Sequence, residues 1–533
     1  MHSFGLLIGL LSISLAVAVA VKRLNFPYPI ALVVAGVAIA LIPGAPRVEI
    51  DPEVIFYLLM PPILAEAAYF TSWRDFWKWR RAIFLLAFGL VTTTTVVVAS
   101  LCVAMIPGMN WATGFLLGAI ASPPDAAAAT SILRTFRLPR RVVQILEGES
   151  LVNDASALTV YRFAIAAIVT GTFSFPKAVL SFFWIAGAGV AVGVACAYLL
   201  VKLYPHFKDP QVEILSSFLL GFIAYLGAEA IHSSGVLAVV ASGLIFGWHA
   251  PQLFSAATRL RAGAVWETTI FLLNATVFLA IGLQMPNAMA ALHKYSRGDL
   301  WLWGSSLALA VIVTRVAWVF PGTYLPRMLS KRIREREAAP SWRAVSVVAW
   351  TGLRGVVSLA AAEAVPLTTS DGTPFPHRDL ILFLTFVVIM TTLVLQGLTL
   401  GPLIRRLKIE PDHSLQEEHL VASIHAAERA VHRISELEKS LGADSGAIHR
   451  VRGYYNDRLH LLRAQLELPP VEEGGQPEEF QTIAEQKIWW ELAKAERDAV
   501  LSLRRQRRIG DEAMRKIEHD IDLLEARIIP RGH

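Results

Sequence analysis

Long apolar segments recur along most of this 533-residue chain, and they constrain its fold more than any other feature. A run of about 20 mostly apolar residues is long enough to cross a lipid bilayer as a helix. By that criterion we expect an all-α polytopic membrane protein with about 13 transmembrane helices. The expected segments are residues 3–21, 28–43, 53–70, 82–106, 111–134, 141–170, 176–203, 211–231, 234–249, 261–284, 299–328, 341–366 and 378–402.

Composition supports this class, because 54% of the residues are hydrophobic and only 17% are charged, against about 25% in soluble proteins. Residues 1–408 hold 31 Lys and Arg and 19 Asp and Glu, whereas residues 409–533 hold 18 and 24. The positive excess therefore belongs to the apolar part. No basic stripe interleaved with aromatic residues is present, so we expect no nucleic-acid partner. Cys102 and Cys196 lie in apolar runs and read as small core residues.

The loops between the expected spans carry basic residues unevenly. One alternate set of loops carries 23 Lys and Arg, and the other set carries 5. Because cytoplasmic loops of membrane proteins are enriched in Lys and Arg, this bias predicts an outside N-terminus, a cytoplasmic C-terminus and residence in the cell inner (plasma) membrane. A cleaved signal peptide is the alternative for residues 3–21. It is disfavoured because Lys22 and Arg23 follow the apolar run and none precedes it.

Residues 409–533 differ in character from the preceding transmembrane domain, residues 1–408. Apolar residues recur there at steps of three and four, which predicts amphipathic helices that pack on each other or on a partner. A polar linker, residues 469–480, separates two helical groups. We expect a helical cytosolic domain with a regulatory or assembly role, and a ligand or pH sensor is the alternative.

Two of the expected spans contain residues that interrupt a helix. Pro123 and Pro124 lie in the middle of segment 111–134, and Gly352 and Gly355 flank Arg354 in segment 341–366. Unwound backbone at membrane depth is tolerated only where it is buried or lines a wet cavity. If the spans form two inverted six-helix repeats, the breaks fall in the fifth helix of each. This is the pattern of transporters whose broken helices meet at a binding site.

An acid lies at one break and a base at the other. We expect Asp125 and Arg354 to compensate the partial charges of the half-helix ends that the breaks create. For Asp125, direct cation binding and a plain salt bridge are the alternatives.

The stretch from Glu147 to Asp154 places acids directly before a long apolar run. On a helix, Glu149 and Asn153, and likewise Ser150 and Asp154, are four residues apart, so the four share one broad face. Carboxylate and hydroxyl oxygens suit a small alkali cation. A partly desolvated Asp154 would hold either a cation or a proton, never both, and this competition is sufficient for exchange.

Ionisable residues within spans are costly and indicate function or pairing. Glu149 fits a buried ion pair, with Arg315 or Arg354 as the candidate partner. Glu229 and His232, three residues apart near a span end, read as interfacial polar residues, and pH modulation through His232 is the alternative. Structural roles are expected for Arg162, Glu267 and Glu363.

These motifs, in this order, resemble the monovalent cation:proton antiporter superfamily, specifically the branch of bacterial and animal Na⁺/H⁺ exchangers. The segments that carry the resemblance are LLMPPILAEAAYF (58–70), ASPPDAAA (121–128), GESLVNDASA (148–157), AYLGAEAIHSSGVLAVVASGLIFG (224–247) and GLRGVVSLA (352–360). The Asn-Asp motif in combination with Gly-Leu-Arg-Gly is highly specific for this family.

The resemblance implies that Asp154 is the carboxylate that carries the cation or the proton, with Ser150 beside it. It implies that Glu66 contributes through water and that the Pro124 carbonyl coordinates from the break. Many relatives have Thr where this chain has Pro124.

The resemblance further implies that Arg315 holds both Glu149 and Asn153, and that Asp125 and Arg354 balance two broken, crossing helices. An Asn-Asp pair, in place of Asp-Asp, goes with electroneutral exchange in the family. A homodimer and alternating access are also implied.

The leading hypothesis is therefore a secondary active antiporter, not an enzyme, that exchanges Na⁺ and Li⁺ for H⁺ without a bound cofactor. A K⁺/H⁺ antiporter of the same fold is the nearest alternative. A gated cation channel and a membrane sensor or scaffold are alternatives from other classes. The chain has no GxxxxGK[ST] loop, which argues against an ATP-driven pump.

Overall fold

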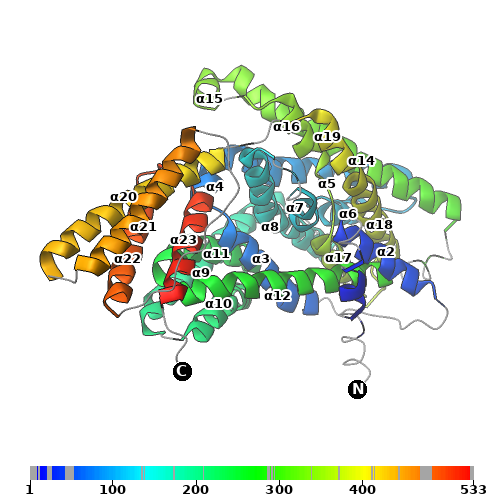
Figure 1. Cartoon of the computed structure of the whole chain (residues 1–533). Helices are drawn as coiled ribbons and strands as arrows, with labels where there is room; N and C mark the ends of the chain where they lie inside the picture. Colours follow the sequence, from blue (N-terminus) through cyan, green and yellow to red (C-terminus); the bar gives the residue numbers. More distant parts are fainter. Residues whose placement is uncertain are drawn as a thin grey trace. The chain divides into compact units, whose positions relative to one another are not determined.

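A computed structural model shows an α-helical chain (Figure 1). It describes residues 9, 12–17, 19–20, 27–42, 53–133, 136, 138–171, 174–207, 209–284, 289, 292, 295–337, 339–369, 372–409, 412, 414–441, 445–467 and 483–528. Within these ranges the extended structure is limited to one isolated β-bridge between Thr368 and Pro374. Most of the expected span 3–21, with Lys22, Arg23 and the linker 469–480, lies outside the described residues.

Eight helices in the described part of the chain are long and apolar enough to cross a membrane. They are Trp73–Met105, Arg140–Thr170, Ala178–His206, Pro210–Ala230, Gly235–Leu253, Ala256–Leu283, Arg297–Leu329 and Arg378–Leu407. Three shorter apolar helices are Tyr28–Ala40, Val54–Phe70 and Trp111–Ala121. The chain is thus a multi-pass membrane protein, and its all-helical class agrees with the expectation from the apolar segments.

The two spans expected to be interrupted are each split into two helices. Segment 111–134 forms α6 (Trp111–Ala121) and α7 (Ala126–Leu133), and segment 341–366 forms α16 (Trp342–Trp350) and α17 (Val356–Glu363). Helix α6 ends at Ala121, separated by Ser122 from the Pro123-Pro124 pair, which lacks the amide donors needed to continue the helix.

Proline also explains a local widening in the span that carries Glu66. Pro61 and Pro62 occupy the first turn of α3 (Met60–Phe70), so they cannot donate to carbonyls four residues earlier. The preceding turn is the π-helix η1 (Val54–Leu59), in which the Met60 amide donates to the Ile55 carbonyl five residues back. Two further π-helical turns are η2 (Leu85–Leu90) and η4 (Thr392–Gln396), and such turns are frequent at functional sites.

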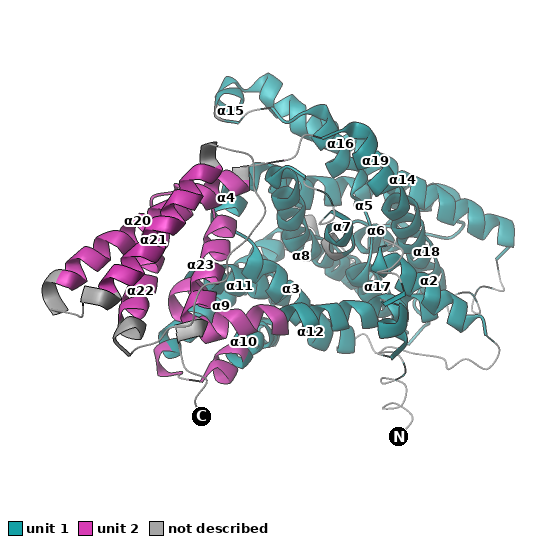
Figure 2. Ribbon diagram, in the orientation of Figure 1, with its two compact units in different colours: residues 1–204, 215–249, 266–411 teal, residues 205–214, 250–265, 412–533 magenta. Residues whose placement is uncertain are grey.

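The chain divides into two compact units, coloured separately in Figure 2. The first comprises Met1–Tyr204, Leu215–His249 and Trp266–Pro411. A large apolar cluster in it joins α5 (Val91–Met105), α6, α8 (Arg140–Thr170), α14 (Arg297–Leu329), α17 and α18 (Arg378–Thr391). Helix α8 is therefore embedded among the helices that contain the two breaks.

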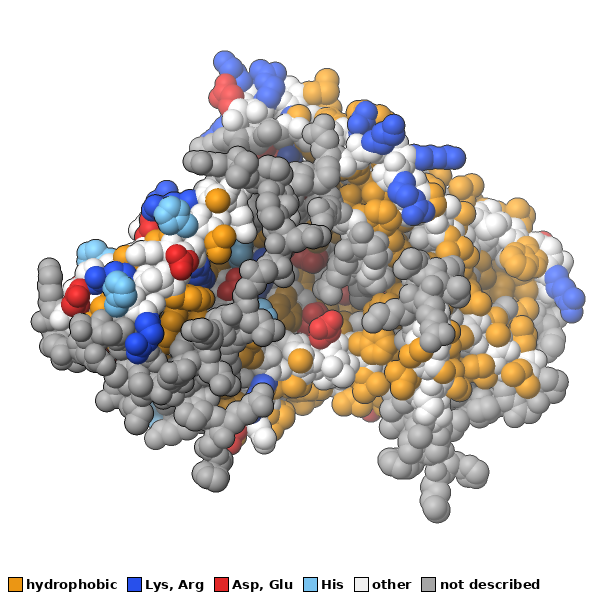
Figure 3. Space-filling model, in the orientation of Figure 1, with side chains coloured by type: hydrophobic (Ala, Val, Ile, Leu, Met, Phe, Trp, Pro, Cys, Tyr) orange, Lys and Arg blue, Asp and Glu red, His pale blue; other side chains and the backbone are white. Residues whose placement is uncertain are grey.

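Within the described part of the chain, the first unit contains eight further α-helices. They are α2 (Tyr28–Ala40), α4 (Trp73–Phe84), α9 (Phe175–Leu203), α10 (Pro210–Ala230), α11 (Gly235–Leu253), α12 (Ala256–Leu283), α15 (Lys331–Arg336) and α19 (Gly397–Leu407), of which α10, α11 and α12 also contribute residues to the second unit. In Figure 3, Lys and Arg side chains gather along α15, α16 and α19, and hydrophobic side chains cover much of the neighbouring surface.

The second unit comprises Pro205–Ile214, Ala250–Val265 and Asp412–His533. Its four long helices are α20 (Ser414–Leu441), α21 (Ser445–Glu467), α22 (Ile483–Arg505) and α23 (Asp511–Ile528). The apolar faces expected from the spacing are buried between these helices, for example at Ile424, Ile434, Ile517 and Ile521. The tail thus packs on itself and on two short segments that flank membrane helices.

Candidate functional site

The two helix breaks meet inside the first unit. The Asp125 amide donates a hydrogen bond to the Leu353 carbonyl over 2.7 Å. Gly355 lies against the Asp125 side chain so closely that a Cβ at this position would collide with its carboxylate. The unwound residues between α6 and α7 are therefore held directly against those between α16 and α17.

Arg354 and Asp125 each lie at an end of a half-helix from the opposite segment. Arg354 is 1% exposed, and its guanidinium donates to the Ala121 carbonyl (3.0 Å), the Ser122 carbonyl (3.2 Å) and the Gly352 carbonyl. The first two carbonyls form the C-terminal end of α6, where a positive charge is favoured. The Asp125 carboxylate accepts from the amide of Val356 (3.4 Å), the first residue of α17, where a negative charge is favoured.

Helix α8 brings Asp154 to this crossing. Asp154 is 5% exposed, and the Asp125 carboxylate acts on it electrostatically. The neighbouring Asn153 is fully buried and donates through Nδ2 to the Pro124 carbonyl over 3.0 Å. The Oδ1 atom of Asn153 has no hydrogen-bond partner among the described residues. A buried amide oxygen without a donor, beside a buried carboxylate, is a pair of hard oxygen ligands.

Two further predicted ligands have half-buried side chains on neighbouring elements. Ser150 lies one turn before Asp154 on α8, and Glu66 lies on α3, which packs against α8. The predicted oxygen ligands therefore lie on three elements: α8, α3 and the unwound segment that contains Pro124.

Glu149 and Arg315 form a buried bidentate ion pair. The Arg315 Nη1 and Nη2 atoms lie 2.6 and 2.9 Å from the two carboxylate oxygens of Glu149, and Nε donates to the Val348 carbonyl over 3.2 Å. The side chains are 0% and 1% exposed. The expectation that Arg315 also holds Asn153 is wrong, because the guanidinium is directed to Glu149 and Val348 and the Asn153 amide group is held by Pro124.

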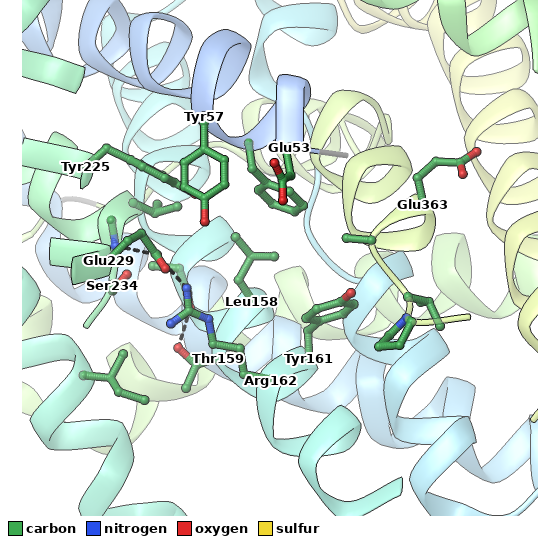
Figure 4. A pocket seen from close by; sticks show the side chains of 18 of the residues that line it. Glu53, Tyr57, Leu158, Thr159, Tyr161, Arg162, Tyr225, Glu229, Ser234 and Glu363 are labelled. Carbon is green, nitrogen blue, oxygen red and sulfur yellow. Dashed lines mark hydrogen bonds and ion pairs between the residues drawn. The ribbon is translucent and has the colours of Figure 1, made fainter. Parts of the chain in front are cut away.

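Glu229 and His232 do not form one side-chain site. The Glu229 carboxylate accepts from Arg162 Nη2 (2.6 Å) and from the Gly235 amide (3.3 Å). His232 is exposed in the turn after α10, with a φ of 55°. The partner of Glu229 is Arg162, a residue to which the sequence assigned only a structural role, and both line the pocket shown in Figure 4.

A buried carboxylate with oxygen ligands at the meeting point of two broken helices defines a class of protein. In a multi-pass membrane protein, this combination is typical of secondary transporters that bind a small cation at mid-membrane. The described residues hold no group of three or more His, Cys, Asp and Glu side chains arranged to bind a metal ion.

Comparison with known proteins narrows the class. A family model described as "Sodium/hydrogen exchanger, transmembrane" matches residues 10–406. The chain is 32% identical to an uncharacterised Na⁺/H⁺ exchanger of Mycobacterium tuberculosis over 98% of this chain and 97% of that protein. It is also 32% identical to the uncharacterised Na⁺/H⁺ exchanger YjcE of Escherichia coli over 99% and 98%.

The chain therefore belongs to the sodium/hydrogen exchanger family, and the resemblance inferred from its motifs is confirmed. The solved structure of the sodium proton antiporter MjNhaP1 from Methanocaldococcus jannaschii has the same fold, with a TM-score of 0.59 and 21% identity. That match covers 76% of this chain and 99% of MjNhaP1. The protein is a transporter that exchanges Na⁺ and H⁺.

Proposed function

We propose that this antiporter binds Na⁺ and H⁺ in competition at Asp154 and carries them across the membrane by alternating access. The observation that carries the proposal is the buried Asp154 carboxylate beside the unpaired Asn153 Oδ1 and the helix crossing. The hydrogen bond from Asn153 Nδ2 to Pro124 orients the amide so that Oδ1 is left for a cation.

The proposed ligands of the cation are the oxygens of Asp154, Asn153, Ser150 and Pro124, with Glu66 acting through water. A bound cation and a bound proton each neutralise the single Asp154 charge, so only one occupies the site at a time. Glu149 is already neutralised by Arg315, so it adds no second exchangeable charge. This supports electroneutral one-for-one exchange.

Charge compensation at the crossing supports the same mechanism. Asp125 and Arg354 offset the half-helix dipoles, so the unwound backbone can be buried near the cation without an uncompensated partial charge. Each tenfold proton gradient would supply about 1.4 kcal/mol for the opposing cation flux.

The wider arrangement is also a proposal. It comprises about 13 spans in two inverted repeats, an outside N-terminus, a cytoplasmic regulatory tail, a plasma-membrane homodimer and a role in pH homeostasis. The charge bias of the loops supports the orientation. Na⁺ with Li⁺ is the proposed cation class. A K⁺/H⁺ exchanger stays the alternative, since a Bacillus subtilis relative, 33% identical over 70% of this chain, is named a sodium, potassium, lithium and rubidium/H⁺ antiporter.

The decisive test is the substitution Asp154→Asn, measured as uptake of Na⁺ driven by a pH gradient in proteoliposomes. We expect exchange to be abolished, because an amide has no charge for the cation or proton to neutralise. The control is Glu267→Gln, which removes an exposed carboxylate from α12 and should leave exchange unchanged. Uptake retained by the Asp154→Asn protein would refute the proposed site.

The same vesicles separate the alternatives. A series of Li⁺, Na⁺, K⁺ and Rb⁺ over pH 6–9 establishes the cation class. Counterflow that saturates, without unitary currents, argues against a channel, and exchange by a chain lacking residues 412–533 argues against a scaffold driven by the tail.

A further inference from the structure

A cavity of about 540 Å³ in the first unit is lined by one face of helix α8 (Figure 4). The α8 residues that line it are Ala155, Leu158, Thr159, Tyr161 and Arg162, and four of them, Ala155, Leu158, Thr159 and Arg162, follow the spacing of one helical face. Asp154 precedes Ala155 and lies one turn before Leu158, on the next turn of the same face. The cavity therefore reaches to within about one helical turn of the proposed cation site, since Ala155, which lines it, adjoins Asp154.

The other elements that line the cavity contribute their ends on a common side. Glu53 directly precedes η1, Glu229 is near the end of α10, Gly235 begins α11 and Glu363 ends α17. The opposite ends of α8 and the following helix are basic, at Arg140, Arg141 and Lys202. If these basic ends are cytoplasmic, as the proposed topology has them, the cavity faces the outside.

Arg162 and Glu229, which both line this cavity, form an ion pair. Arg162 Nη2 lies 2.6 Å from Glu229 Oε1, and the two side chains are 39% and 20% exposed. Arg162 also donates to the Ser233 carbonyl over 3.5 Å, and the Gly235 amide donates to Glu229. Arg162, on the same helix as Asp154, is thus held by residues at the end of α10 and in the turn that follows it.

The position of Arg162 has an electrostatic consequence. It lies two helical turns beyond Asp154, so a cation moving from the cavity to Asp154 passes a fixed positive charge. Inside a protein cavity, where the dielectric is lower than in water, such a charge repels an approaching cation more strongly than it would in bulk water. Glu229 cancels that charge only while the pair is formed. The other charged groups lining the cavity are Glu53, Glu363 and Arg378.

We propose that Arg162 and Glu229 form an electrostatic gate on the external side, which sets the affinity for the cation that enters from outside. Glu229 neutralises the Arg162 charge, so an entering cation is no longer repelled on its way to Asp154. The gate rests on the proposed function at Asp154, but it adds two residues that act only on external access. They position charge along the path and do not bind the transported ion at Asp154.

The test is a double-substitution series in proteoliposomes of known orientation, with the Na⁺ KM measured separately from the external and the cytoplasmic side. Glu229→Gln leaves the Arg162 charge uncompensated and should raise the external KM about tenfold, with the cytoplasmic KM unchanged. Arg162→Gln should leave the external KM the same or lower. The double variant should return to within about threefold of the starting value, because it removes the repelling charge.

The matched control is Arg81→Gln. Arg81 forms a 2.7 Å ion pair with Glu337 at similar exposure (28% and 21%), but neither residue lines the cavity. We expect it to leave the external KM unchanged. If Glu229→Gln does not fold, Glu229→Asp keeps the charge but lengthens the pair, and it should raise the external KM by a smaller factor.

Three results would overturn the gate: an external KM that does not change in Glu229→Gln, an equal change from both sides, or a double variant no better than Glu229→Gln alone. These outcomes differ from a failure of the proposed function. Exchange retained by Asp154→Asn would refute the cation site, whereas a normal external KM in the Glu229→Gln protein would refute only the gate.

Discussion

At the scale of single residues, the Glu149–Arg315 pair shows how this protein buries charge. Both side chains are removed from solvent, and each of the three guanidinium nitrogens of Arg315 donates a hydrogen bond. Forming such a pair brings little net stability, since desolvation opposes the attraction. Removing one partner is costly, because the other is left charged and buried.

We expect Arg315→Ala to destabilise the protein by about 3–5 kcal/mol, since Glu149 would then be buried without a counter-ion. The measurement is the melting temperature and yield of the full-length protein in detergent. Arg81→Ala is the comparison. It breaks a partly exposed pair and should cost about 1 kcal/mol or less. An Arg315→Ala protein that melts and expresses like the unsubstituted chain would contradict this account.

At the scale of elements, the crossing of the two broken helices depends on close backbone approach. Asp125 reaches both the Leu353 carbonyl and the amide at the start of α17, and Gly355 leaves the space for its carboxylate. A side chain at position 355 would occupy that space. The unwound segment that contains Pro124 is thus held by contacts with a segment more than 200 residues later in the chain.

Gly355→Ala should therefore displace Asp125 and reduce exchange at least tenfold, with a lower melting temperature. The matched substitution is Gly263→Ala on α12, where a Cβ would meet nothing within 4 Å and activity should be normal. Both are assayed as the initial rate of Na⁺ uptake per reconstituted molecule. Equal rates for the two variants would show that the crossing tolerates a methyl group and that the close contact is unimportant.

At the scale of the whole molecule, the tail is joined to segments next to membrane helices. Arg259, near the start of α12, makes a bidentate contact with Asp522 of α23, at 2.7 and 2.6 Å. Asp522 also accepts from Arg497 over 2.9 Å. Helix α12 begins in the second unit and continues into the first, so a change in this cluster acts on a helix that both units share.

Glu518 makes this cluster sensitive to pH. It is 3% exposed, and Oε1 has no hydrogen-bond partner among the described residues. Burial raises the pKa of Glu518 to about 7, against the lowering effect of Arg259, Arg497 and Arg504, and Asp522 adds to the rise. The folded tail therefore keeps a proton that the unfolded chain has released near its ordinary pKa of 4.5. Stability is lost as the pH rises from 4.5 through 7.

We expect Glu518→Gln to stabilise the tail at pH 8 by roughly 3 kcal/mol and to flatten the dependence on pH between 5 and 8. The reason is that the amide carries no charge to bury. The measurement is thermal unfolding of the full-length protein, in which limited proteolysis of α20–α23 reports the unfolding of the tail. Glu512→Gln removes an exposed carboxylate from the same helix and should keep the original pH dependence. A Glu518→Gln tail that loses stability at pH 8 would reverse the sign and refute the argument.

Much of the architecture follows from the sequence because the bilayer leaves few choices. Backbone groups in lipid must be paired within a helix, so long apolar segments predict an all-helical, multi-pass protein. The two breaks are also predictable from the sequence. Pro123 and Pro124 lack the amide donors that a helix needs, and the glycines on either side of Arg354 are unfavourable inside a helix. The Asn-Asp motif identified the family. The sequence also indicates that Glu149 pairs with Arg315 or Arg354, since a buried acid requires a counter-ion.

Only the tertiary structure decided which groups meet. Asn153 is held by Pro124 and not by Arg315, and Arg162 pairs with Glu229, although the sequence distinguished neither contact. Arg259 and Asp522 are 263 residues apart. Helical periodicity places a side chain on a face of its own helix, but the rotation and packing of neighbouring helices determine what that face meets. The apolar length of a span is local information, whereas the partner of a charge depends on the whole fold.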